Sequence, residues 1–334
     1  MLATTPENVT AALPQGESWL QATVCEAMRL TSDTLHLRLV SATNEPLPSH
    51  APGAHVALKC GPDLIRHYSL TGPCEHEGLY DLGIKLSAAS QGGSRWIFDE
   101  VSVGSQLTIS APRNNFPLIE TAGSYLFLSG GIGITPIIPM LYRLRALRVR
   151  AQLIHMCRAR EELAFEHWLS ELSGFHNMRL HYDADSGQLD LQTVLDHRDA
   201  DTQIYCCGPA GMIEDVRLYC VSEGREARFH FEYFTPSENP VGDTGDCEFT
   251  VIQKSTGRKI PVPKTKTMLA ALREAGIKMK SECEYGVCGW CAVRVLEGRP
   301  AHFDSYLTAG EKEANELVLP CVSRCKGQSL TLDI

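Results

Sequence analysis

In the middle of the chain, short apolar runs alternate with segments whose apolar residues recur at helical spacing. The apolar runs, which predict buried strands, cover residues 124–129, 151–156, 178–182 and 202–206. The segments with helical spacing cover residues 137–147, 161–172 and 209–221. Buried strands that alternate with helices predict a doubly wound α/β sheet.

The pattern before this region is different. Residues 18–112 consist of short strand patterns separated by turns, with little helical periodicity. Such a pattern predicts a small antiparallel barrel. One short helix is predicted within it, opening at Gly92, Gly93 and Ser94. We expect the first 17 residues to form a flexible tail.

Beyond the α/β region the chain changes character again. Residues 235–246 are polar and rich in proline and glycine, which predicts a linker and a domain boundary. After it, residues 247–252 and 259–262 predict the two strands of a hairpin. Residues 267–276 then predict a helix, because Thr267 can cap its start and Gly276 can end it.

Composition narrows the functional classes. The chain has 334 residues, 43% hydrophobic and 21% charged, which predicts two or three folded domains. Its net charge is -9 and its lysines and arginines are dispersed, so we expect no nucleic-acid binding. No apolar stretch approaches the roughly 20 residues that span a bilayer, and the N-terminus has no signal-peptide pattern. We therefore expect a cytoplasmic protein without membrane association.

Thirteen cysteines in an intracellular chain are expected to be thiols rather than disulfides. Four of them have the C-x4-C-x2-C spacing plus a distant cysteine that is typical of plant-type [2Fe-2S] ligation. These four are Cys283, Cys288, Cys291 and Cys321. Gly286 and Gly289 would allow the loop to turn tightly around a cluster. Two alternatives stay open: a four-cysteine zinc site, and Cys325 as the fourth ligand in place of Cys321.

Glycine-rich turns follow two of the predicted central strands. The first contains Gly130 and Gly131, with Thr135 placed to cap the next helix and Pro136 at its first position. The second is the run Cys207, Gly208 and Pro209. Glycines here let backbone amides approach a pyrophosphate at a helix N-terminus, although tight turns also need glycine for steric reasons. Cys207 is expected against a nicotinamide ring or, alternatively, as a small buried core residue.

A flavin mononucleotide needs a cation and amides for its phosphate, an apolar wall for its ring and a hydrogen-bond partner near the reactive ring nitrogen. Arg66, Tyr68 and Ser69 could supply these from one strand. The turn at Gly92, Gly93 and Ser94 would add a helix N-terminus for the phosphate. In the alternative interpretation, Arg66 is an exposed charge and Tyr68 a barrel core residue.

Together, the motifs R-x-Y-S-L, G-G-S, G-G-I-G-I-T-P, C-G-P and C-x4-C-x2-C resemble the phthalate dioxygenase reductase family. The resemblance covers nearly the whole chain beyond the first 17 residues. It implies an antiparallel FMN-binding β-barrel over residues 18–117, a ferredoxin reductase-like NAD-binding domain over residues 118–234 and a β-grasp ferredoxin domain over residues 247–334. Vanillate demethylase and carnitine monooxygenase reductases are similar in this architecture.

The resemblance also implies roles for individual residues. Ser69 and Cys207 are implied to be catalytic. The residues implied to bind FMN or NADH are Arg66, His67, Tyr68, Ser69, Gly92, Gly93, Ser94, Gly130, Gly131, Thr135, Pro136, Cys207, Gly208, Pro209 and Phe234, the last covering the flavin before nicotinamide displaces it.

The implied function is that of an oxidoreductase. Electrons would pass from NADH through FMN and a [2Fe-2S] cluster to the Rieske centre of a separate terminal oxygenase, with this chain as a monomer. A cytochrome P450 or a quinone is the alternative acceptor, and a zinc-stabilised interaction module is the alternative from another class. NADH is expected, although Arg158 and Arg160, after the second central strand, could accept the 2'-phosphate of NADPH.

Overall fold

The computed structural model describes residues 19–61, 64–86, 92–234, 248–281, 286, 289–304, 306, 307 and 309–334. It divides into two compact units, one over residues 18–237 and one formed mainly by residues 238–334. The predicted tail and the predicted linker lie outside the described residues. The two units are described separately below.

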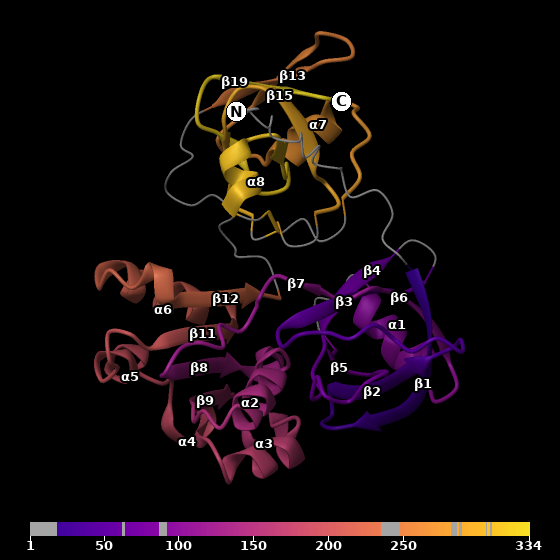
Figure 1. Cartoon of the computed structure of the whole chain (residues 1–334). Coiled ribbons are helices and arrows are strands. Elements are labelled where there is room, and N and C mark those ends of the chain that lie inside the picture. The colour runs from indigo at the N-terminus through magenta and orange to yellow at the C-terminus, as the bar shows by residue number, and fades with distance from the viewer. Residues whose placement is uncertain are drawn as a thin grey trace, which may run out of the picture. The chain divides into compact units, whose positions relative to one another are not determined.

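The predicted antiparallel barrel is present in the first unit (Figure 1). Its elements are β1 (Trp19–Arg29), β2 (Thr34–Ser41), β3 (Ala54–Lys59), β4 (Ile65–Ser69), β5 (Leu79–Lys85), α1 (Gly93–Glu100), β6 (Gln106–Ser110) and β7 (Arg113–Asn114). The strands pair in the order β4-β3-β6-β1-β2-β5, and β7 pairs with β3. A bridge between Leu70 and Leu82 joins the two edges of this sheet. Alternate residues such as Val56 and Leu58 face a shared apolar core, to which Ile97 of α1 also belongs.

The second half of this unit is the predicted doubly wound sheet. Its strands are β8 (Tyr125–Gly130), β9 (Gln152–Cys157), β10 (Asn177–Tyr182), β11 (Gln203–Gly208) and β12 (Phe229–Tyr233). Its helices are α2 (Ile137–Ala146), α3 (Glu166–Ser173), α4 (Asp183–Ser186), α5 (Leu191–Asp196) and α6 (Ala210–Ser222). The described strands are all parallel, in the order β10-β9-β8-β11-β12. Helices α2 and α3 pack on one face, and α5 and α6 pack on the other (Figure 1).

Two details of the sequence prediction are wrong here. Thr135 does not cap α2: its hydroxyl donates to the carbonyl of Ile132 at 2.9 Å, and Pro136 occupies the N-cap position. The reason is that residues Gly131–Ile134 form a 3-10 helix, so the chain enters α2 already in helical conformation, without an extended capping residue. The helix predicted over residues 161–172 begins at Glu166 instead, because Phe165 has a left-handed backbone with φ of 60°.

The second unit has the β-grasp arrangement, a mixed sheet with a helix packed on it (Figure 1). Its elements are β13 (Phe249–Gln253), β14 (Lys259–Val262), α7 (Met268–Glu274), β15 (Val293–Glu297), β16 (Pro300–Ala301), α8 (Ala309–Ala314), β17 (Leu317–Val318), β18 (Arg324–Cys325) and β19 (Ser329–Leu332). The sheet order is β14-β13-β19-β15-β17. The hairpin β13-β14 is as predicted, and Thr267 caps α7 by accepting from the Ala270 amide at 3.1 Å.

Candidate cofactor sites and family

Two of the four predicted cluster ligands lie side by side in the second unit. The sulfur atoms of Cys291 and Cys321 are 3.3 Å apart, and both residues are buried. Two thiolates bound tetrahedrally at about 2.3 Å from one metal ion are about 3.8 Å apart. A small outward adjustment would therefore let both cysteines bind one ion of a cluster. Cys283 and Cys288 lie outside the described residues.

Cys325, the rival fourth ligand, is engaged elsewhere. Its sulfur accepts from the Gly327 amide at 3.2 Å and donates to the Ser329 carbonyl at 3.4 Å. Cys325 belongs to the core between the sheet and α7, whereas Cys291 and Cys321 share a separate apolar cluster. The geometry therefore favours Cys321 as the partner of Cys291.

The two glycines of the cysteine loop are required by its packing. Gly286 and Gly289 both have φ of +75°, a conformation that side chains disfavour. A Cβ atom at Gly286 would lie 2.6 Å from the Val322 side chain, and one at Gly289 would lie 2.2 Å from the Tyr306 ring. The loop thus presses against the segment that carries Cys321, an arrangement that fits four thiolates around one cluster.

The glycine-rich turns of the nucleotide-binding sheet meet at the carboxyl ends of β8 and β11. A Cβ atom at Gly208 would lie 2.8 Å from the Gly130 amide nitrogen, and one at Gly130 would lie 2.5 Å from the Pro209 ring. Gly131 follows directly, with φ of +51°. This edge is where ligands bind in doubly wound folds, and backbone without side chains fits the close approach of a pyrophosphate.

Cys207 lies at the end of β11 and is fully buried in the apolar core of the sheet. Burial raises the pKa of its thiol well above the ordinary value, and the nearby Glu232 carboxylate adds to this effect. The thiol is therefore neutral at physiological pH. Its burial agrees with the core alternative, and contact with a nicotinamide stays a prediction.

Strand β4 and the start of α1 bring the predicted FMN residues together. A Cβ atom at Gly93 would lie 2.6 Å from the Arg66 side chain, so the cation packs on the G-G-S turn. Gly92 is the N-cap of α1, with φ of 107°, and Ser94 is in the first turn. A guanidinium beside a helix N-terminus suits a phosphate. Tyr68, from the same strand, packs against the barrel core.

His67 offers an independent sign of a polar ligand. Its two ring nitrogens are buried, and neither has a hydrogen-bond partner among the described residues. Its ring lies 5.4 Å from that of His55. Burial lowers the pKa of His67 to about 3, and the nearby His55 and Arg113 act in the same direction. Because buried polar atoms are normally satisfied, an uncharged imidazole with open nitrogens fits the polar edge of a flavin ring.

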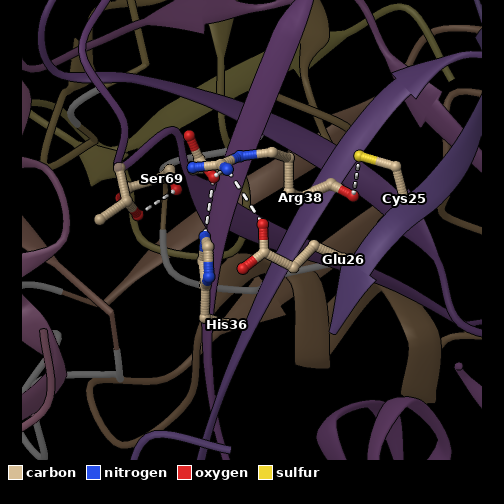
Figure 2. Close-up of polar contacts among 7 residues, drawn as sticks. Cys25, Glu26, His36, Arg38 and Ser69 are labelled. Carbon is tan, nitrogen blue, oxygen red and sulfur yellow. Dashed lines mark hydrogen bonds and ion pairs between the residues drawn. The ribbon is translucent and has the colours of Figure 1, made fainter. Parts of the chain in front are cut away.

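The sequence analysis missed Glu232. The Ser69 hydroxyl of β4 donates to the Glu232 carboxyl of β12 at 3.4 Å, which joins the barrel to the nucleotide-binding sheet (Figure 2). Burial raises the pKa of Glu232 to about 8, although the Ser69 hydrogen bond opposes the shift. The available sequence signal was an acidic residue within the aromatic run from residue 229 to 234. Phe234 follows this strand and is partly exposed.

A second polar group was also missed. Asp81 accepts from His36 at 2.7 Å and from Arg38 at 2.8 Å inside the barrel wall (Figure 2). Burial would raise the pKa of Asp81, but the hydrogen bonds and charges of these two partners lower it overall. The His36 ring also packs edge-on against Phe165 and Trp168 of the nucleotide-binding half. This group therefore helps to fix the barrel against α3.

Two family models match the chain. A 2Fe-2S iron-sulfur cluster binding domain matches residues 251–326, and an oxidoreductase NAD-binding domain matches residues 127–218. Together with the barrel and the sites above, these matches define an iron-sulfur oxidoreductase that uses a nicotinamide coenzyme. The NAD and [2Fe-2S] predictions are confirmed. No helix in the described part of the chain is both long and apolar enough to cross a membrane.

Known proteins resemble the chain over most of its length. Vanillate O-demethylase oxidoreductase of Pseudomonas sp. (strain HR199 / DSM 7063) is 36% identical over 315 residues, which cover 93% of this chain and 99% of that protein. The carnitine monooxygenase reductase subunit of Escherichia coli (strain K12) is 33% identical, with 93% and 97% covered. Oxidoreductase NdmD of Pseudomonas putida is 34% identical over 98% of this chain, which spans only 55% of that longer protein.

Solved structures agree with these relatives. Phthalate dioxygenase reductase, described as a modular structure for electron transfer from pyridine nucleotides to [2Fe-2S], is 28% identical with a TM-score of 0.66, covering 95% of this chain and 98% of that one. A type IV self-sufficient cytochrome P450 monooxygenase is 32% identical with a TM-score of 0.77, covering 95% of this chain and 41% of that one. The chain belongs to the phthalate dioxygenase reductase family, which confirms the predicted fold class and supports FMN as the flavin.

Proposed function

We propose that this protein is the reductase component of a Rieske non-haem iron oxygenase system. The observation that carries the proposal is that one chain joins an NAD-binding sheet and a [2Fe-2S] domain to a barrel whose strand β4 packs Arg66 on the G-G-S turn at the start of α1. NADH gives two electrons as a hydride, whereas a [2Fe-2S] cluster accepts one. Bound FMN supplies the conversion between them, and the protein supplies position and environment.

Within this proposal, the residues have distinct roles. Arg66, Gly92, Gly93 and Ser94 hold the FMN phosphate, and His67, Tyr68 and Ser69 contact the ring. Phe234 covers the ring until the nicotinamide displaces it. The NADH-binding residues are Gly130, Gly131, Thr135, Pro136, Cys207, Gly208 and Pro209. The four cluster ligands are Cys283, Cys288, Cys291 and Cys321. The proposed domains cover residues 18–117, 118–234 and 247–334, and residues 235–246 form the linker before the last one.

The acceptor is inferred to be the Rieske centre of a separate terminal oxygenase. Relatives are named as parts of vanillate demethylase and carnitine monooxygenase systems. A Rieske centre has a higher potential, roughly -150 to +300 mV, than a plant-type cluster near roughly -400 mV, so the last transfer runs downhill. The test is anaerobic mixing of the purified protein, NADH and a candidate oxygenase. Reduction of the Rieske centre that requires this protein supports the proposal, and reduction equally fast without it contradicts the proposal.

A cytochrome P450 or a quinone is the second candidate acceptor. It is favoured by the likeness to the self-sufficient P450 monooxygenase and by a 34% identity to tetrachlorobenzoquinone reductase of Sphingobium chlorophenolicum. The same assay with a P450 or a substituted quinone in place of the oxygenase distinguishes these acceptors. In either case the domain architecture and the internal electron path are the same.

The structure bears on the choice between NADH and NADPH. Arg160 follows β9, but its guanidinium donates to the Asp185 carboxylate at 2.8 and 3.0 Å and lies over the Tyr182 ring. The Arg158 Nε atom lies 3.9 Å from the Glu162 carboxylate. Carboxylates paired with both arginines would repel a 2'-phosphate, which supports NADH.

We predict that Asp185→Asn improves the use of NADPH. The substitution removes the carboxylate charge beside Arg160 and leaves the guanidinium available to a phosphate. We expect kcat/KM for NADPH to rise several-fold while that for NADH changes little. Glu166→Gln, an exposed acid at the start of α3, serves as the matched control. Unchanged coenzyme selectivity in Asp185→Asn would show that Asp185 does not set the choice.

We also infer that the reductase works as a cytoplasmic monomer. This part of the proposal is supported by the ten described cysteines, which are all free as expected in a reducing compartment, and by the need of an electron carrier to reach its partner. Sedimentation of the cofactor-loaded protein at several concentrations tests it, since a mass of twice 36.8 kDa would contradict a monomer.

A further inference from the structure

One segment of the second unit touches both parts of the chain that carry cluster ligands. The Tyr306 amide donates to the carbonyl of Gly286, in the cysteine loop, at 3.1 Å. A Cβ atom at Gly286 would lie 2.9 Å from the Cα atom of Asp304. On the other side, the Ser323 hydroxyl, two residues after Cys321, donates to the Asp304 carboxylate at 3.4 Å. Asp304 therefore stands between the loop and the distant ligand.

The carboxylate of Asp304 is fully buried. It accepts from the Leu307 amide at 2.8 Å, which fixes the turn around it. A buried negative charge is costly unless it is compensated. Lys312 of α8 provides compensation: its ammonium lies 3.9 Å from the carboxylate and donates to the Asp304 carbonyl. The His302 Nδ1 atom lies 3.7 Å from the same carboxylate.

This ion pair places two opposite charges beside the ligand-bearing segments, with the Asp304 carboxylate buried and Lys312 partly exposed. Reduction of a cluster adds one negative charge, so a fixed carboxylate nearby opposes reduction and a fixed ammonium favours it. The effect is larger for a charge that is shielded from water, as the Asp304 carboxylate is, than for the partly exposed Lys312 ammonium.

We propose that Asp304 and Lys312 are positioning residues that hold the two ligand-bearing segments together and set the reduction potential of the [2Fe-2S] cluster. The inference rests on the proposed cluster assignment. It goes further by naming the groups, outside the ligands, that decide how readily the cluster accepts an electron from the flavin and passes it on.

The test is a potentiometric titration of the full-length, cofactor-loaded protein under anaerobic conditions, followed by the EPR signal of the reduced cluster. Asp304→Asn removes the negative charge and should raise the potential. Lys312→Gln removes the positive charge and should lower it. The conservative variants Asp304→Glu and Lys312→Arg should shift it less. Asp333→Asn, the same chemical change at an exposed position of the same unit, should leave it unchanged.

Opposite shifts are the signature that a purely structural role would not produce. Shifts in the same direction, or no shift in variants with full iron content, would overturn the proposal. If Asp304→Asn does not assemble a cluster, Lys312→Gln still decides, because the carboxylate keeps its hydrogen bonds to Leu307 and Ser323 in that variant. A lower potential in Lys312→Gln than in Lys312→Arg then supports the proposal, and an equal or higher one overturns it. Iron and acid-labile sulfide in the unaltered protein test the cluster assignment separately, since their absence would defeat the proposed function and not this inference alone.

Discussion

At the scale of single residues, desolvation controls the titratable groups around the predicted flavin site. The Glu232 carboxyl of β12 is desolvated, and its described hydrogen-bond partner is the Ser69 hydroxyl of β4. A carboxyl group in such surroundings keeps its proton at neutral pH. At this position the barrel and the nucleotide-binding sheet are thus joined by a neutral hydrogen bond.

The raised pKa of Glu232 predicts a pH dependence of stability. The folded protein keeps this proton up to about pH 8, whereas the unfolded chain releases it near 4.5. Between these values the folded state binds more protons, so its stability should fall as pH rises, by at most about 1.4 kcal/mol per pH unit. Glu232→Gln should not show this fall. Urea unfolding of both proteins at pH 5.5 and pH 8 measures it, and parallel changes in the two proteins would contradict the assignment.

The two candidates for the fourth ligand give a matched pair of substitutions. Cys321→Ser should lose most of the bound iron, because a serine replaces the thiolate beside Cys291. Cys325→Ser should keep its iron and lose at most about 2 kcal/mol of stability, because a hydroxyl can reproduce the hydrogen bonds to Gly327 and Ser329. Iron content and visible absorption of the two variants decide. The reverse result would make Cys325 the ligand.

At the scale of elements, the turns after β8 and β11 hold two parallel strands and their helices in close contact. A Cβ atom at Gly208 would lie 2.6 Å from the end of the flexible Met212 side chain, which can move, and 2.8 Å from the Gly130 backbone nitrogen, which cannot. Steric demand therefore explains this glycine without any nucleotide. Whether its amide also serves a pyrophosphate is a separate question, which a pair of substitutions answers.

Gly208→Ala should destabilise the protein by about 1–3 kcal/mol, because the new methyl group overlaps backbone atoms at 2.8 Å. Gly211→Ala, in the first turn of α6 with open space around it, should be neutral or stabilising by up to about 1 kcal/mol. Thermal unfolding and the dissociation constant for NADH should be measured for both. If Gly208→Ala is as stable as the unaltered protein, the steric explanation is wrong.

At the scale of the whole molecule, each unit has its own apolar core. The cores of the first unit lie within the barrel and on the two faces of the parallel sheet, and those of the second lie around the β-grasp sheet and the buried cysteines. Two units with separate cores can fold and titrate independently. The division also matches the predicted chemistry, since the predicted flavin and nicotinamide residues belong to one unit and the four predicted cluster ligands to the other.

We predict that a chain ending at Ser237 keeps NADH oxidation with ferricyanide, because the barrel and the nucleotide-binding sheet form one compact unit. It should lose at least tenfold in the reduction of an acceptor that takes electrons from the cluster. Cytochrome c or a Rieske oxygenase serves as that acceptor, and the full chain is the control. Equal rates in both chains would mean that the flavin reduces the acceptor directly.

Local patterns in the sequence were sufficient for most of this architecture. The apolar runs specified the parallel strands, Thr267 specified the start of α7, and the cysteine spacing specified the cluster domain. These features depend on interactions within one element or one loop, so they can be inferred from neighbouring residues. The start of α3 was missed because the left-handed Phe165 is held by packing against Gly83 and His36, far away in sequence.

The sequence by itself determined the fold class, the cofactor classes and the residues that could bind them. Only the tertiary structure decided that Glu232 meets Ser69, that Asp185 pairs with Arg160, that Cys321 and not Cys325 approaches Cys291, and that Asp304 stands between the two ligand-bearing segments. Each of these depends on contacts between residues distant along the chain. Such contacts are set by how strands and loops pack, and the pKa values they alter follow from burial, which no local pattern of residues contains.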